Sequence, residues 1–203
     1  MATDHRVRLS YLSGQTTTYT GILQPLAATN GLLFPYTPQI SFSQSIDYAT
    51  LAMTHANQSY HAYSKTANPR ISLSGKFAIQ NKTDGEYALA AIHFLRTNSK
   101  MYFGENDRNA GVPPPVMSLD GYGTYMFNKL RVILIDFSHS FNENDQMVSI
   151  STGNGNVMLP AVFMLTCSLI VQNTARAQRQ DFTLDKFRSG ELMSSAPNDS
   201  GWI

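Results

Sequence analysis

The side chains best suited to acid–base chemistry are carboxylates in three pairs with two-residue spacing. Two carboxylates can act as general acid and general base, as in glycoside hydrolysis, when their environments separate their pKa values. Each pair here stands in a polar loop or at a helix start, where water keeps both members ionised. Turn and helix-cap roles are therefore favoured over catalysis for Asp84 with Glu86, Glu105 with Asp107, and Glu143 with Asp145.

Metal-binding and nucleophilic patterns are also incomplete. His55 and His61 come nearest to a pair of metal ligands, but no HExxH or His-x-His pattern and no nearby cysteine completes a zinc site. The stretch 142–145 lacks the glycine and the distal glutamate of a calcium loop. The Gly-x-Ser-x-Gly elbow of a serine hydrolase is absent from the sequence. We expect no catalytic residue, no bound metal and no cofactor.

The composition points to a folded protein with few charges. The 203 residues carry 15 basic and 14 acidic side chains, a formal charge of +1, so the excess of Lys and Arg that duplex-binding proteins use is missing. Charged residues make up 14%, against roughly 25% in soluble domains. Because interface cores are depleted of charge, this composition favours a protein that hides much of its surface in an assembly.

The single cysteine, the N-terminal residues and the longest apolar stretch indicate in which cellular compartment the protein is expected to fold. The single cysteine, Cys167, lies in an apolar run and is expected to be a buried small side chain. The N-terminus lacks the basic-then-apolar pattern of a secretion signal, and the longest apolar stretch, 157–171, is too short for a membrane span. We expect assembly in a reducing cytosol and no membrane contact.

The pattern of apolar residues predicts a chain made mainly of strands. In 71–79 Ile71, Leu73, Phe77 and Ile79 alternate with other residues, which is typical of a half-buried strand. In contrast, 132–135 is apolar at every position and is expected to be buried on both faces. The runs with strand character are 7–12, 32–43, 59–65, 71–79, 116–119, 129–141, 147–150 and 161–171.

One helix is expected between residues 83 and 104. Thr83 and Glu86 match a capping box, and Gly104 could supply a left-handed cap at the other end. Arg96 and Lys100 would complement the helix dipole near its C-terminal end. An apolar stripe at three- and four-residue spacing should pack on the sheet; it consists of Tyr87, Ala91, Ile92, Phe94, Leu95 and Met101.

Several strands with one helix predict a mainly β protein, an antiparallel sandwich or barrel with the helix laid against it. We interpret residues 1–30 as an extended N-terminal arm, residues 31–193 as a single domain, and residues 194–203 as a loose tail or docking arm.

Four segments together resemble the baseplate tail-tube proteins of contractile-tailed phages, the myophages. The sequence GLLFPYTPQI at 31–40 is similar to a strand motif of that family, and AIHFLRTNSKMYFG at 91–104 is similar to its helix end. The proline-rich connector PPPVMSLDGYG at 113–123 and the strand at 132–137 follow in the same order and spacing. The resemblance covers roughly residues 20–193 and brings no catalytic residue with it.

The resemblance implies a tail-tube-type fold, in which strands from six subunits join an inner barrel and the helix packs outside. It implies a structural virion protein, a baseplate ring that initiates or caps the tail tube and links it to the central hub. The implied partners are further copies in a hexameric ring, the tail tube protein, adjacent baseplate and hub proteins, and the tape measure protein as a further candidate. DNA would only pass through the lumen, and assembly would occur in the host cytoplasm. The structural and interface candidates are Phe34, Tyr36, Phe94, Leu95, Pro114, Tyr122, Val132 and Phe137.

Two other classes of function stay open at this point. A tail-associated cell-wall hydrolase would need paired catalytic groups, for which the sequence provides weak candidates. A carbohydrate-binding β-sandwich module could use Tyr122, Tyr125 and Trp202 as stacking platforms. Within the phage-tail reading, a first ring on the hub and a second ring that receives the tube protein are equally compatible with the sequence.

Overall fold

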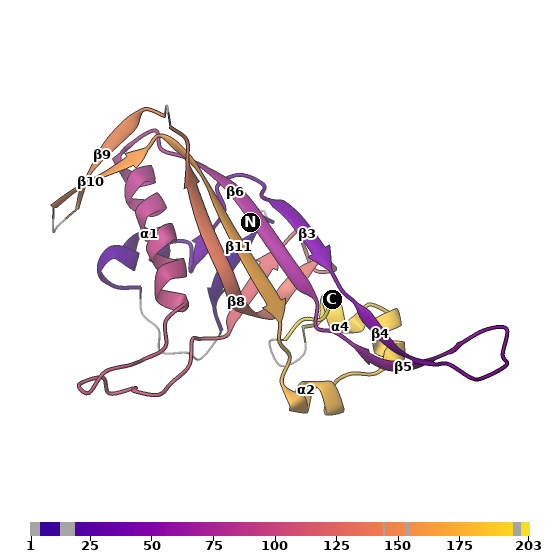
Figure 1. Ribbon diagram of the computed structural model, residues 1–203. Coiled ribbons are helices and arrows are strands. Elements are labelled where there is room, and N and C mark those ends of the chain that lie inside the picture. Colours follow the sequence, from indigo (N-terminus) through magenta and orange to yellow (C-terminus); the bar gives the residue numbers. More distant parts are fainter. Residues whose placement is uncertain (1–4, 13–18, 144, 153–154, 197–199) are drawn as a thin grey trace.

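The computed structural model describes residues 5–12, 19–143, 145–152, 155–196 and 200–203 (Figure 1). The protein is mainly β, and its strands pair antiparallel. In chain order the elements are β1 (Arg8–Tyr11), η1 (Gly21–Ala27), β2 (Leu32–Leu33), β3 (Gln39–Ser43), β4 (Ile46–Leu51), β5 (Tyr60–Thr66), β6 (Arg70–Ala78), α1 (Lys82–Asn98), β7 (Met117–Gly121), β8 (Phe127–Phe141), β9 (Met147–Thr152), β10 (Gly155–Pro160), β11 (Val162–Val171), α2 (Ala175–Gln180), α3 (Leu184–Arg188) and α4 (Glu191–Ser194).

The main sheet has seven strands in the order β2-β1-β7-β8-β11-β6-β3, and two hairpins, β4–β5 and β9–β10, stand apart from it. Figure 1 shows β8, β11 and β6 as long neighbouring strands, with α1 beside them and the β4–β5 hairpin projecting away from the body. The sheet is open, because β2 and β3 are edge strands among the strands that the structure describes.

The core lies on one face of this sheet. Alternate residues of β6 and β11 are buried there, among them Leu73, Phe77 and Leu165, and the strand pattern expected for 71–79 is confirmed. Phe94 and Leu95 of α1 are fully buried in the same core, so the apolar stripe of the helix is confirmed at these positions. Met101 lies beyond the end of α1 and is exposed.

Phe34 connects the two ends of the sheet. It follows edge strand β2, its backbone N–H donates to Val7 at 3.0 Å, and its ring lies against Gly75 in β6. A Cβ at Gly75 would overlap that ring, so the bare glycine makes room for the aromatic side chain. The sheet therefore curls until its two halves share one core.

The expected start and end of the helix are wrong. The N-cap is Asn81, whose side chain accepts from the Asp84 backbone N–H at 2.8 Å, and Thr83 lies inside the first turn. The Asp84 side chain accepts from the N–H of Gln80, the residue before the cap, at 3.3 Å, so the helix start is capped two residues earlier than expected. The helix ends at Asn98, well before Gly104.

The expectation of an arm at residues 1–30 is corrected for the part that the structure describes. β1 pairs with both β2 and β7 inside the sheet, and Leu9 is fully buried. η1 packs against α1 through Leu23 and Leu26. Residues 1–4 and 13–18 of the expected arm lie outside the described residues.

The C-terminal segment docks on its own domain. Gly201 forms a parallel bridge with Leu130, and its N–H donates to the Lys129 carbonyl at 3.0 Å. Ser200 is buried and donates to Asn173 at 3.0 Å. Residues 200–203 are therefore held on the domain and are not a loose tail, while residues 197–199 of the expected tail lie outside the described part of the chain.

Burial of 132–135 on both faces is also wrong. Val132 is buried, but Ile135 is 53% exposed. The β8–β11 register shifts between Leu134 and Asp136, which makes Ile135 the extra residue of a bulge. Core packing covers one face of β8, and the apolar Ile135 lies outside the regular alternation.

Candidate assembly surface

The face of the sheet that points away from the core is lined with small hydroxyl side chains. The registers align Ser41 of β3 with Ser72, Ser168 and Asp136 of successive strands. The next row aligns Gln39 with Ser74, Thr166 and Ser138. We call the eight residues of these two rows the hydroxyl face.

This face is polar but nearly uncharged. Ser74 and Thr166 share a hydrogen bond of 3.0 Å across β6 and β11. Asp136 is the single charged residue in the two rows, while Arg70 and Lys76 lie in the rows on either side. Such a surface can be hydrated and offers few cations to hold a nucleic acid backbone.

Two long backbone edges flank the hydroxyl face. β7 pairs with β8 only between Phe127 and Val132, so the β8 segment 133–141 has β11 on one side and no further described strand on the other. β3 is the edge at the opposite end and pairs only with β6 among the described strands. Open edges of this kind are templates for pairing with another chain.

The remaining edge, at β2, is closed. The Leu33 N–H donates to the hydroxyl of Tyr87 at 2.8 Å, and the same hydroxyl lies 3.1 Å from the Leu33 carbonyl. A side chain from α1 therefore occupies the backbone groups that a neighbouring strand would use. The edge at β2 is therefore closed by a side chain, whereas the edges next to the hydroxyl face are open among the described strands.

The β4–β5 hairpin is a second candidate for a contact surface. Every residue of both strands is exposed, including Ile46, Tyr48, Leu51, Tyr60 and Tyr63. The rings of Tyr48 and Tyr63 meet edge to face at 6.1 Å. An isolated two-stranded hairpin is marginally stable in water, so this projecting ribbon is expected to be covered in an assembly.

The interface candidates separate into a buried and a surface group. Phe34, Phe94, Leu95 and Val132 are buried in the core, whereas Phe137 is half-buried against it. Three candidates lie at the surface: Tyr36, Pro114 and Tyr122. Only this last group is available for a partner.

Three of the paired carboxylates, Asp84, Glu86 and Asp107, make local contacts of the expected kind, whereas one carboxylate oxygen of Asp145 is buried without a hydrogen-bond partner and departs from the expected solvated loop position. Asp84 belongs to the cap of α1, and Glu86 lies 3.6 Å from Lys82 on the exposed side of the helix. Asp107 accepts from the Asn109 N–H at 2.9 Å within a loop. Within the described ranges, no three His, Cys, Asp or Glu side chains are grouped closely enough to hold a metal ion.

The three aromatic side chains considered for carbohydrate stacking do not share one surface. Tyr122 and Tyr125 line a hollow beside β7, with a volume of about 550 Å³. Trp202 lines a separate groove of about 440 Å³, and its ring contacts that of Phe182 in a tilted arrangement with ring centroids 4.9 Å apart. That groove runs between Tyr63 of the projecting hairpin and the C-terminal helices.

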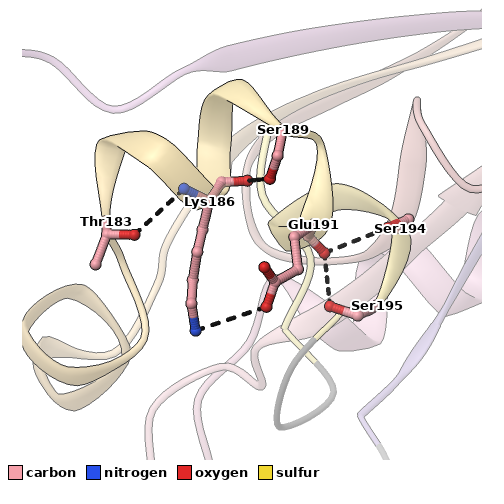
Figure 2. A network of polar contacts seen from close by, with 6 residues as sticks. All are labelled: Thr183, Lys186, Ser189, Glu191, Ser194 and Ser195. Carbon is pink, nitrogen blue, oxygen red and sulfur yellow. Dashed lines mark hydrogen bonds and ion pairs between the residues drawn. The ribbon is translucent and has the colours of Figure 1, made fainter.

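Short contacts hold the C-terminal helices together beside this groove. Figure 2 shows the side chains of Lys186 in α3 and Glu191 at the start of α4 pointing toward each other, 3.6 Å apart. Thr183 caps α3 by accepting from the Lys186 N–H at 3.3 Å, and Ser195 donates to the Glu191 carbonyl at 2.6 Å. The ion pair is exposed and adds little stability, so the caps and turns carry most of this arrangement.

Comparison of the chain with protein-family models and with curated protein sequences finds no match. None of the helices in the described part of the chain is long and apolar enough to cross a membrane.

Sequence reasoning missed the hydroxyl face and the open edges. The alternation of Ser72 and Ser74 with Ile71 and Leu73 is visible in the sequence and could have identified a polar outer face. The pairing of β6 with β11, and the closure of the β2 edge by Tyr87, depend on contacts between residues more than fifty positions apart.

Proposed function

We propose that this chain is a structural ring protein of a contractile phage tail. Six copies join through their sheets at the baseplate end, where the ring initiates or caps the tail tube and links it to the central hub. The proposal starts from the motif resemblance at 31–40, 91–104, 113–123 and 132–137, and it is supported by a geometric property of the sheet.

That property is the direction of the two open edges. Strands β8, β11, β6 and β3 each run antiparallel to the next, so β8 and β3 point in opposite directions. In a ring with rotational symmetry, β3 of one copy would therefore meet β8 of the next copy antiparallel. Four strands from every copy would form one continuous barrel without a remaining edge. This single observation carries the proposal.

The dimensions and the chemistry of the sheet suit a tube wall. β11 has 10 residues, and ten residues in a strand span roughly 33 Å. With α1 and the core outside, the hydroxyl face would line the lumen. The two rows of the hydroxyl face offer DNA no Lys or Arg and so none of the salt-dependent grip that each such contact adds, whereas Arg70 and Lys76 lie in the rows on either side.

The proposal also assigns the other exposed surfaces. The tail tube protein, the adjacent baseplate and hub proteins and the tape measure protein are the proposed neighbours, and the β4–β5 hairpin is the surface that would reach a neighbouring layer. The proposed location is the baseplate of the virion, with assembly in the host cytoplasm. Both a ring on the hub and a ring that receives the tube fit these surfaces.

The test on intact particles is cryo-electron microscopy of the tail with this protein labelled. We expect density for the chain in a sixfold ring around the tube axis. Density on outer wedges or fibres, or a copy number that is not a multiple of six, would contradict the proposal.

The test on the purified chain uses disulfide cross-links between the two edges. Ser41→Cys on β3 is combined with Cys at Asp136, Ser138 or Ser140 on β8, three positions that sample the possible registers. At least one combination should form a ladder of covalent oligomers. Light scattering and a peptidoglycan-hydrolysis assay on the unmodified chain address the alternative of a monomeric hydrolase or carbohydrate-binding module.

A further inference from the structure

The two open edges of the sheet lie at different levels along the strands. On β3 the open edge runs over residues 39–43, which pair with residues 70–74 of β6. On β8 its regular part runs from Asp136 to Phe141, and the registers through β11 align this part with residues 72–77 of β6. The open edge of β8 is therefore offset from that of β3 toward the Phe141 end of the strand.

The core side of both open edges is apolar. β3 carries Ile40 and Phe42 on this side, opposite buried residues of β6. β8 carries Phe137, His139 and Phe141 on the same side, opposite buried residues of β11. Within the described residues, no backbone hydrogen bond from outside the sheet reaches either edge. Both edges are thus free to continue the sheet and its core into a neighbour.

The opposite side of both edges is polar and exposed. A shift of the pairing by one residue would turn the apolar side of one copy toward the polar side of the next. β3 of one copy can therefore join β8 of the next only in every second register. The polar side is formed by Gln39, Ser41 and Ser43 on β3 and by Asp136, Ser138 and Ser140 on β8.

Three such registers place Ser41 opposite the regular part of the β8 edge, at Asp136, Ser138 or Ser140. The first continues the rows of the sheet at one level and carries the pairing back across the bulge at Ile135. The other two displace the next copy by two or four residues. Both displacements run toward the Phe141 end, the direction in which the β8 edge is offset.

The tilt of strands in closed barrels selects the larger displacement. Strands tilt by typically about 35–45° against the barrel axis, and the stagger around the barrel is linked to this tilt. Four strands from each copy are about 19 Å wide and four residues are about 13 Å long, which corresponds to a tilt of about 35°. A two-residue displacement corresponds to a tilt of only about 19°.

The same displacement covers two exposed aromatic rings. Phe42 is 45% exposed and Phe141 is 46% exposed, although Phe141 packs edge to face on the buried Phe163 at 5.8 Å. With four residues of displacement, Ile40 of the next copy lies opposite Phe141, and Phe42 lies opposite His139. Diagonal neighbours across a strand pair are about 7–8 Å apart, within reach of aromatic side chains, so Phe42 also reaches Phe141.

We propose that β3 of the next copy joins β8 with a displacement of four residues, which places Ser41 opposite Ser140. This inference rests on the proposed ring and specifies its register. The displacement sets the tilt of the barrel, and the core-side contacts continue the core of one copy into the next. These contacts form an apolar seam, which consists of Ile40 and Phe42 of one copy with His139 and Phe141 of the other.

The experiment compares the rates at which double-cysteine variants of the full chain form covalent oligomers. Ser41→Cys with Ser140→Cys and Ser43→Cys with Ser138→Cys are directly opposite in the proposed register. Ser41→Cys with Ser138→Cys and Ser43→Cys with Asp136→Cys are the matched pairs for a two-residue displacement. The first two variants should react at least threefold faster than the second two, because directly opposite side chains are closer than diagonal ones.

These reactions report contacts between copies. Within one chain two strands lie between β3 and β8, so the paired positions are about 14 Å apart, whereas a disulfide requires Cα atoms within about 7 Å. Burial raises the pKa of the native Cys167 thiol to about 12, so this cysteine does not compete.

The rates separate the register from the ring itself. If the pairs for a two-residue displacement are faster, or if Ser41→Cys with Asp136→Cys is fastest, the four-residue displacement is overturned and the ring stands. Equal rates in all variants would indicate an edge without a fixed register and would also overturn the displacement. If no pair forms oligomers, the ring and the register are both overturned.

The apolar seam is tested by Phe42→Thr in the chain with Ser41→Cys and Ser140→Cys. Threonine is a good strand former, so the substitution removes the ring and keeps the strand propensity of β3. The yield of oligomers should fall at least tenfold at limiting protein concentration. Tyr48→Thr, which removes an exposed aromatic ring from a strand outside the main sheet, is the matched control and should leave the yield unchanged. Equal yields from the two variants would overturn the seam.

Discussion

The hydroxyl of Tyr87 on α1 accepts a hydrogen bond from the backbone N–H of Leu33 at 2.8 Å and donates to the carbonyl of the same residue at 3.1 Å. Burial raises the pKa of this hydroxyl, so it stays protonated and remains a donor. The contact ties the two-residue strand β2 to the helix and closes one edge of the sheet. The edges at β3 and at the second half of β8 have no such closure among the described residues.

Tyr87→Phe should lower the free energy of unfolding by about 1–3 kcal/mol, because the Leu33 backbone groups lose their partner in a partly buried site. Urea unfolding measures the change. Tyr63→Phe is the control, since its hydroxyl meets Thr66 on the exposed hairpin at 2.9 Å and should matter by less than about 0.5 kcal/mol. Equal effects of the two substitutions would show that the edge closure adds no stability.

Gly75→Ala should destabilise the protein by about 1–3 kcal/mol, because the new methyl group overlaps the buried ring of Phe34. In an ordinary strand the same change would be neutral or favourable, so the sign tests the contact. Phe34→Leu in the same chain should reduce the cost of the alanine. Strictly additive losses in thermal or urea unfolding would contradict direct packing of the two residues.

Asn81→Ala should cost about 1 kcal/mol through loss of the helix cap, whereas Thr83→Ala should change stability by only a few tenths of a kcal/mol. Asn81 accepts from the Asp84 N–H, and Thr83 lies one residue inside the helix start. Chemical denaturation of both variants gives the comparison. A larger loss for Thr83 would move the cap back to the position expected from sequence.

The caps show where sequence reasoning succeeds and where it loses precision. Asn81 with Asp84 and Thr83 with Glu86 have the same spacing, and a local motif cannot choose between them. The choice follows from tertiary packing: with the helix starting at Lys82, Gly85 lies against Ile150 of β9, and a Cβ there would overlap that side chain. The existence and the buried face of the helix were predictable because its stripe repeats over several turns.

Among the strands, too, some were predicted correctly from the sequence and others were not. β6 was predicted closely because Ile71, Leu73 and Phe77 alternate with polar residues. β8 was misjudged because a bulge at Ile135 interrupts the alternation, and β1 was taken for an arm because its partners in β7 are more than a hundred residues away. Open edges, and hence the candidate assembly surface, are properties of the finished sheet.

His139 should make stability fall in acid. Burial first, and then the charge of Arg96, lower the pKa of His139 in the folded protein below its ordinary value of 6.5. The unfolded chain therefore binds the proton more readily, so stability falls as the pH drops through 6.5 and stops falling below the lowered pKa. His139→Gln should reduce this difference between urea midpoints measured at about pH 7.5 and about pH 5. An unchanged pH dependence would assign the acid sensitivity to other groups.

The last prediction concerns the hydroxyl face as the lining of the proposed lumen. Ser138→Lys with Ser140→Lys places two cations on the exposed outer side of β8, and rotational symmetry repeats them in every copy of the ring. Rings of this variant should bind duplex DNA at low salt and release it as salt rises, with a slope of log K against log salt near −0.9 for each phosphate neutralised.

Ser138→Gln with Ser140→Gln is the matched control, similar in length but uncharged, and it should bind DNA as weakly as the unmodified ring. The comparison requires that both variants form rings of the same size in light scattering, so that ring formation is not the cause of a difference. Salt-dependent DNA binding by the lysine chain before assembly, with no increase after assembly, would place the two residues outside a lumen. A strong increase on assembly is expected only if the cations converge on a common channel, because six copies then act on one DNA molecule at once.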